Sequence, residues 1–81
     1  MAGQEIGGDV AESCSYRIYL RDALNRIVSA YNIECADDQI ARAMAETALT
    51  ASGQHAVELW ERTRRVCYYV LEEGLAVPVE D

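Results

Sequence analysis

The stretch from Gln54 to Gly74 constrains the fold most, because it contains the only tryptophan of the chain and the longest unbroken helical period. At about 100° per residue, small and apolar side chains spaced three or four residues apart fall in one narrow sector of a helical wheel. Further apolar residues widen that sector to roughly half of the circumference or more. We therefore expect a buried helix over residues 54–73 with neighbours on two sides. Its core stripe comprises Ala56, Trp60, Thr63, Cys67, Val70, Leu71 and Gly74.

Two further amphipathic segments precede this helix. An apolar stripe at alternating spacings of four and three residues predicts a helix over 13–31, with Ile18 exposed on its polar face. The carboxylates of Asp37 and Asp38 suit the N-cap and the positive end of a second helix over 37–51, and Ser52 and Gly53 break its period. The residues expected to face inward are Tyr16, Leu20, Ala23, Ile27 and Tyr31 in the first helix and Ile40, Met44, Ala48 and Ala51 in the second.

The expected architecture is therefore all-α, a compact bundle of these three helices. We expect one helical domain over 12–75, a flexible leader over 1–11 and a short extended acidic tail over 76–81. A chain of 81 residues buries only about 60% of its unfolded surface, so its core is small. Self-association as a homodimer, or a partner protein, is an expected source of additional stability.

The net charge of −7 is concentrated at the two ends of the chain. Residues 13–71 hold seven arginines and seven acidic residues, which cancel, whereas three carboxylates precede this region and four follow it. Acidic ends on a balanced body oppose binding to nucleic acid and to membrane surfaces, and they favour a protein partner with a basic surface. Acidic tails that only keep a small protein soluble are the alternative explanation.

The expected compartment is the cytoplasm. The sequence has no run of about 20 apolar residues and no basic, apolar amino terminus, so neither a membrane span nor a signal peptide is predicted. The three cysteines are odd in number and widely spaced, which predicts reduced thiols rather than a disulfide framework.

Residue types needed for catalysis or metal binding are sparse. His55 and Glu58 have the helical spacing of a base and its orienting carboxylate, but the pair occurs once and Glu58 falls on the polar face. Cys14, Cys35 and Cys67 are too far apart in the sequence to preorganise a zinc site with His55, and Cys67 is expected in the core. Phosphate-binding and nucleophile motifs are absent. We therefore expect a non-enzyme without a metal or a cofactor.

The predicted second and third helices, joined at Gly53, superficially suggest a helix-turn-helix that binds DNA. The third helix would then present Glu58 and Glu61 to the phosphates, which opposes binding. Most of its arginines follow a glutamate at a spacing of four residues, which neutralises them within the helix. Nucleic acid is therefore not the expected partner.

The side chains expected to bind a partner lie on the third helix. Trp60, Arg64 and Tyr68 follow one another at intervals of four residues, so they could stack as a cation–π ladder. Tryptophan, tyrosine and arginine are also the residue types enriched in binding hot spots. An arginine that lies over its own core is the alternative. The full expected partner-binding set is Trp60, Arg64, Tyr68, Tyr69, Arg62, Arg65, Glu72 and Glu73, with Tyr69 exposed beside the two flanking arginines.

Size, acidity and the missing catalytic motifs together favour a small non-enzymatic protein that acts by stoichiometric binding to another protein. Inhibitors of host defence encoded by phages or mobile elements, and immunity proteins, are of this kind. A structural or adaptor subunit of a larger helical assembly is the main alternative. A DNA-binding helix-turn-helix and a metal or small-ligand binder are the less favoured alternatives.

Overall fold

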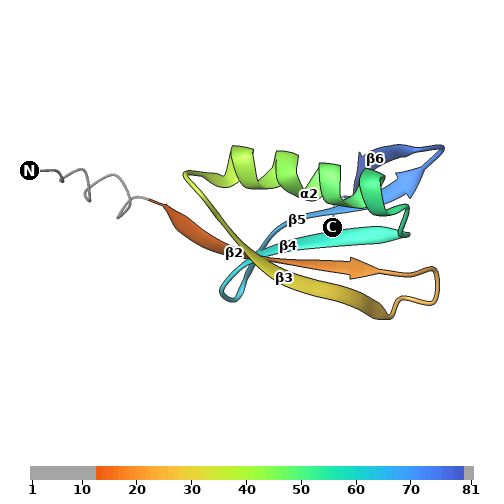
Figure 1. Ribbon diagram of the computed structural model, residues 1–81, viewed down its shortest axis with the longest axis horizontal. Coiled ribbons are helices and arrows are strands. Elements are labelled where there is room, and N and C mark those ends of the chain that lie inside the picture. The colour runs from red at the N-terminus through yellow and green to blue at the C-terminus, as the bar shows by residue number, and fades with distance from the viewer. Residues whose placement is uncertain (1–12, 80–81) are drawn as a thin grey trace, which may run out of the picture.

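The structure, a computed structural model, describes residues 13–79, and it overturns the expected all-α bundle. These residues form one antiparallel sheet of five strands and one helix that covers a single face of it (Figure 1). The elements in chain order are β2 (Cys14–Arg21), β3 (Ile27–Cys35), α2 (Asp38–Ser52), β4 (Ala56–Glu61), β5 (Arg64–Glu72) and β6 (Leu75–Pro78). The predicted leader, residues 1–11, lies outside the described part of the chain.

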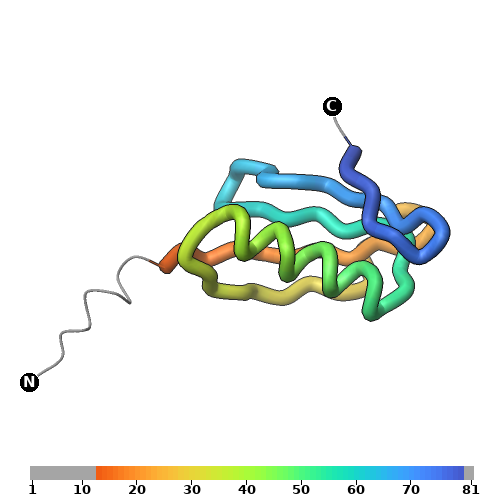
Figure 2. Tube along the Cα trace, turned by 90° about the horizontal axis from the view of Figure 1, so that it is seen from above, coloured from red at the N-terminus to blue at the C-terminus, as the bar shows by residue number. Residues whose placement is uncertain are grey.

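The strand order across the sheet is β3-β2-β4-β5-β6. Strands that are consecutive in the chain are joined by hairpins, except β3 and β4. Between these two, α2 carries the chain over the sheet, so that β4 pairs with β2 (Figure 2). Seen from above, α2 runs alongside the strands, and β3 lies at one edge of the sheet. Residues 76–78 of the segment expected as an acidic tail belong to the opposite edge strand, β6.

The predicted helix over 13–31 is wrong, because the same residues also satisfy the period of a strand. Residues i and i+4 share a face in both structures, so Tyr16 and Leu20 fit either pattern. The residue between them decides the matter: Ile18, expected on the surface, is only 1% exposed and lies in the core. Tyr16, Ile18 and Leu20 thus follow the strict alternation of a strand with one buried face.

The predicted helix over 54–73 is wrong for the same reason. It is replaced by β4, β5 and the two-residue turn between them, in which Arg62 has a positive φ of 58°. Gly74, placed in the core stripe of that helix, instead forms a two-residue turn with Glu73 between β5 and β6. Both turn residues have positive φ, 54° and 82°, which suits the right-handed twist of the flanking strands.

The second predicted helix is present as α2. Asp37 caps it, since its carboxylate accepts a hydrogen bond of 3.0 Å from the Ile40 backbone N–H. Gly53 ends it in the left-handed conformation, with φ 71°. The buried face of α2 was assigned wrongly, however: Ile40 and Met44 are 47% and 42% exposed. The residues that α2 buries against the sheet are Ala41, Ala45 and Leu49.

The core lies between α2 and the sheet face beneath it. Alanines at the contact allow α2 to approach the strands closely, and Leu49 fills the remaining space between them. Tyr69, expected on the surface, is only 5% exposed and belongs to this core. The strand residues that complete the core include Tyr16, Ile18, Leu20, Cys35, Val57 and Leu59.

Candidate functional site

The sheet face opposite α2, which we call the open face, carries the candidate site. Figure 1 shows α2 on one side of the sheet and no described segment on the other. Strand alternation sends every second side chain to each face, so the neighbours of the core residues point to the open face. On β2 these are Arg17, Tyr19 and Arg21. The β2–β4 register places Trp60 beside Arg17 and Glu58 beside Tyr19.

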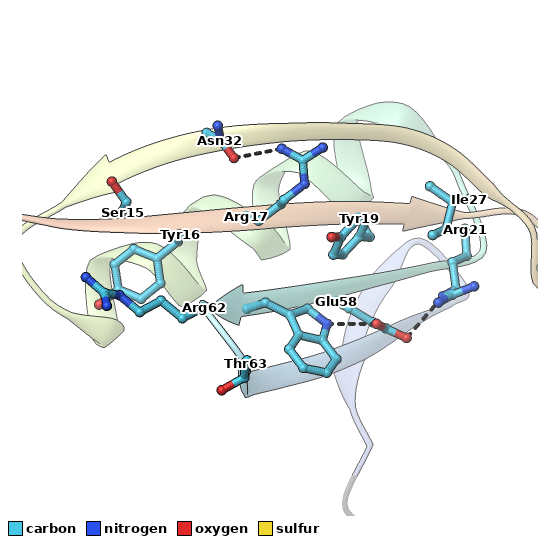
Figure 3. Close-up of a pocket in the computed structure, with 11 residues that line it drawn as sticks. Ser15, Tyr16, Arg17, Tyr19, Arg21, Ile27, Asn32, Glu58, Arg62 and Thr63 are labelled. Carbon is cyan, nitrogen blue, oxygen red and sulfur yellow. Dashed lines mark hydrogen bonds and ion pairs between the residues drawn. The ribbon is translucent and has the colours of Figure 1, made fainter.

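The open face has a hollow over β3, β2 and β4. The hollow has a volume of about 620 Å³ and is open to solvent on one side. Figure 3 shows its side chains spread over β2, β3 and β4, with α2 behind the sheet. The residues that line the hollow are Ser15, Tyr16, Arg17, Tyr19, Arg21, Ile27, Asn32, Glu58, Trp60, Arg62 and Thr63.

Glu58 accepts hydrogen bonds from two other side chains that line this hollow. One of its carboxylate oxygens accepts a hydrogen bond of 2.9 Å from the Trp60 indole N–H. The other oxygen accepts a hydrogen bond of 3.0 Å from Nε of Arg21, and this ion pair is largely shielded from solvent (Figure 3). Arg21 also donates to the backbone carbonyl of Asn25. These bonds hold the indole and the guanidinium in one orientation before any ligand arrives.

Arg17 occupies the exposed part of the hollow, between β3 and the ring of Tyr19. It donates a hydrogen bond of 2.8 Å to the side-chain oxygen of Asn32 on β3. Its guanidinium carbon lies 5.5 Å from the centre of the Tyr19 ring, within cation–π range. These contacts orient the exposed guanidinium and leave further N–H donors that a ligand can reach.

A second arginine and tyrosine pair extends the site onto β5. Tyr68 is the register partner of Glu58, and Arg65 is the register partner of Trp60. The guanidinium carbon of Arg65 lies 5.3 Å from the centre of the Tyr68 ring. The open face therefore combines three aromatic rings with arginine side chains across three adjacent strands.

Arg64 does not form the expected ladder with Trp60 and Tyr68. Four-residue spacing aligned the three on a helix, whereas in the sheet Arg64 turns toward the amino terminus of α2. Its guanidinium donates to both carboxylate oxygens of Asp38 at 3.3 Å and also pairs with Glu61. Arg65, the next residue, is the one that lies over Tyr68.

Arg64, Asp38 and Glu61 form an ion-pair cluster, and the Asp38 carboxylate links this cluster to the core. The Tyr16 hydroxyl donates a hydrogen bond of 2.7 Å to it. This bond, together with the bonds from Arg64, holds the pKa of Asp38 below its ordinary value, because they favour the charged form. The same hydrogen bond raises the pKa of Tyr16, because the hydroxyl can donate to Asp38 only while it keeps its proton. The cluster ties β2, β5 and α2 together and has a structural role.

The remaining predicted binding residues are spread over the molecule. Tyr69 faces α2, where burial, and then the Glu46 carboxylate beside its hydroxyl, raises its pKa to about 12. Arg62 lines the hollow at the β4–β5 turn. Glu72 and Glu73 lie at the opposite end of β5, at the turn to β6. The structure thus brings Trp60, Arg62, Arg65 and Tyr68 to the open face and separates the other four from them.

The candidates for catalysis and metal binding do not come together. His55 precedes β4 and is exposed, and the odd spacing to Glu58 sends the two side chains to different faces of a strand. Cys14 and Cys35 are register partners on β2 and β3, and Cys67 lies on β5; all three are free thiols. Within residues 13–79 no cluster of metal-ligating side chains is found. In the same range, no helix is long and apolar enough to cross a membrane.

Sequence reasoning missed the contribution of β2 to the site. Arg17, Tyr19 and Arg21 are not among the predicted binding residues, and Glu58 is predicted only on the polar face of a helix. The signal was present, since polar or amphipathic residues alternate with apolar ones from Ser15 to Arg21 over a full strand length. Comparison of the chain with protein-family models, with curated proteins and with solved structures gave no match.

Proposed function

We propose that the protein is a non-enzymatic binding protein that contacts a partner protein through the open face of its sheet. One observation carries this proposal: the rings of Tyr19 and Trp60 and three arginines line a hollow of about 620 Å³ on paired strands, and Tyr68 and Arg65 extend the same face onto β5. These are the residue types that dominate binding energy in protein interfaces. Side chains already ordered by hydrogen bonds lose less conformational entropy on binding.

The chemistry of the hollow defines what would fit it. Its lining holds three arginines, Arg17, Arg21 and Arg62, against one carboxylate, Glu58, which Arg21 already neutralises. A partner segment that brings an acidic group to Arg17 and an apolar or planar side chain to Trp60 is complementary to it. The expectation of a basic partner surface rests on the acidic ends of the chain, and it concerns a different part of the contact.

A stoichiometric mode of action accords with the arrangement, because the site offers shape and hydrogen-bond donors but no base paired with a nucleophile. We propose that the protein blocks or modifies its partner by occupying its surface, as inhibitors and immunity proteins do. The proposed location is the cytoplasm, which fractionation of the native host would test. An adaptor role would use the same face but would leave the partner active.

The test is quantitative affinity capture from the native host with matched variants of the tagged full chain. Trp60→Ala and Arg17→Gln alter the open face, whereas Arg26→Gln alters an arginine in the β2–β3 turn outside the hollow. We expect a partner that wild type and Arg26→Gln retain and that both open-face variants lose by about tenfold or more, as for hot-spot truncations of at least 1.4 kcal/mol.

Two results would contradict the proposal. One is a partner whose recovery is the same with all variants, which would move the interface elsewhere. The other is binding of single-stranded oligonucleotides that Trp60→Ala abolishes, because aromatic rings and arginines on a sheet can also stack on bases. Loss of the fold is controlled by comparing the far-ultraviolet circular dichroism of every variant with that of wild type.

A further inference from the structure

The free edge of the sheet at β3 is a second surface, which adjoins the open face where Ile27 and Asn32 line the hollow. β3 pairs with β2 on one side and has no neighbour on the other among residues 13–79. It contains neither proline nor lysine, and its only charged side chain is Glu34, near its end. Long edge strands of this composition are rare in monomers, because their unpaired backbone groups recruit another strand.

The hydrogen bonds of the β2–β3 hairpin show which β3 backbone groups are free. The Asp22 N–H donates to the carbonyl of Arg26 at 3.0 Å, whereas the Arg21 carbonyl accepts from His55 on the other side of β2. Backbone direction alternates along an antiparallel strand, so Leu20, Ile18 and Tyr16 also turn toward β3. Their register partners, which consequently bond to β2, are Ser29, Tyr31 and Ile33.

The intervening residues of β3 therefore direct their backbone groups away from the molecule. Ala30, Asn32 and Glu34 are exposed, and their N–H and C=O groups point outward from the free edge, perpendicular to the strand. An apolar groove runs beside this edge on the α2 side, with a volume of about 430 Å³. Its lining is uncharged: Tyr31, Ile40, Ala43, Met44, Thr47 and Ala48.

We infer that β3 pairs antiparallel with β3 of a second copy of this chain, with Asn32 on the two-fold axis. This register joins Ala30 to Glu34 of the second copy and uses all three outward residues, which gives about six backbone hydrogen bonds. It also sets Tyr31 opposite Ile33 of the second copy on the α2 side, an aromatic and β-branched pair that favours strand association.

The same register places the apolar grooves of the two copies on one face and keeps the two Glu34 carboxylates apart. The two-fold axis runs through the β3 edge and places both α2 helices on the same face of the joined sheets. The exposed Ile40 and Met44, at 47% and 42%, thus line an apolar groove on each side of the new β3–β3 pair. The two Glu34 carboxylates are offset by four residues, about 13 Å along the strand, which exceeds the Debye length of about 8 Å at physiological ionic strength. The dimer leaves both open faces accessible.

The test compares variants by sedimentation equilibrium over a concentration series. Asn32→Pro removes an outward N–H without touching the β2 ladder, and Met44→Glu puts a charge into the groove at an exposed position. We expect wild type to dimerise, and each variant to raise the dimer dissociation constant about tenfold or more. The controls are Asn32→Ala, which keeps the N–H, and Leu75→Glu, an exposed apolar position on β6; both should dimerise like wild type.

Amide hydrogen exchange shows whether the dimer uses this edge. In the dimer, the amides of Ala30, Asn32 and Glu34 should exchange about tenfold or more slowly than in the dilute monomer. Because every copy carries a net charge of −7, dimerisation should strengthen with salt.

A monomer at the highest soluble concentration would overturn the inference. So would a dimer in which these three amides stay unprotected, or their protection by a different protein while wild type alone remains monomeric. If Asn32→Pro fails to fold, Met44→Glu and the exchange data decide the outcome. Failure of the dimer would leave the open-face proposal intact, because the two surfaces share no residue whose substitution is tested in both.

Discussion

Replacing either of two isoleucines by alanine separates the sheet from a helical bundle. Ile18 lies in the core at 1% exposure, whereas Ile27, at the start of edge strand β3, is 49% exposed. The helical pattern predicts the opposite, with Ile27 in the core stripe and Ile18 on the surface. The two substitutions remove the same atoms, so the difference between their effects reports burial alone.

The magnitudes follow from the atoms removed. Ile18→Ala deletes three buried carbon groups at about 0.8 kcal/mol each, or about 2.4 kcal/mol, before the cavity is counted. Incomplete relaxation around the cavity brings the expected loss to about 3–4 kcal/mol. A chain of 81 residues has a free energy of unfolding of about 4–12 kcal/mol, so this is a large share of it. Ile27→Ala should cost about 1 kcal/mol or less, because half of its side chain is already in solvent.

Equilibrium unfolding in urea, followed by circular dichroism, measures both losses. Wild type and the two variants should share one m-value, so that the midpoints report the free energy of unfolding directly. Ile18→Ala should shift the midpoint at least twice as far as Ile27→Ala. Equal shifts, or a larger one for Ile27→Ala, would refute the burial of β2 beneath α2.

Three further predictions concern a turn, a buried tyrosine and an ion-pair cluster. Gly74→Ala should lower the free energy of unfolding by about 1 kcal/mol, because φ is 82° although no atom lies within 4 Å of the added carbon; urea titration with no loss would exclude the tight turn. Tyr69 has a pKa of about 12, above its ordinary 10.0. Stability should therefore hold below pH 10 and fall between pH 10 and 12, less steeply in Tyr69→Phe; identical alkaline profiles would count against this. Arg64→Glu should lower the melting temperature, because it places a third carboxylate beside Asp38 and Glu61; an unchanged melting temperature would mean that the cluster is not structural.

The sequence predicts the helix correctly where the local signals allow one structure only. Asp37 before an alanine-rich segment and Gly53 after it are capping residues in specific conformations, and both have that role. The buried face was harder to assign, because Ala41 and Ala45 carry little hydrophobic signal and Ile40 and Met44 carry more. Hydrophobicity therefore predicted burial for the face of α2 that is exposed in the structure.

The strands were missed because short apolar runs fit two periods. Cys67 and Leu71 on β5 share a face in a helix and in a strand alike, so spacing of four residues does not distinguish the two. The β-branched and aromatic residues around them favour strands, and they deserve more weight than the period in segments of this length. The β2–β3 turn depends on a left-handed Asn25 and on Asp22 accepting backbone N–H groups, a signal visible only once a hairpin is considered.

The candidate site was predicted correctly where residue type decided and wrongly where helical geometry decided. Trp60 and Tyr68 were chosen for their residue types, and these side chains do lie on the open face. Their expected link to Arg64 depended on helical geometry, and the sheet replaces it by Arg65. The pairing of Arg17 with Trp60 joins residues far apart in the sequence. Such a contact follows only from the strand order, which no local pattern specifies.

The central claim, that the open face binds a partner protein, is tested most directly at Trp60. Because this is the only tryptophan of the chain, fluorotryptophan labelling gives a single fluorine NMR signal that reports this face alone. On titration with the protein that affinity capture identifies, we predict a shift of this signal and its protection from a soluble paramagnetic quencher. A complex that forms at full stoichiometry while the signal keeps its position and its solvent accessibility would contradict the account.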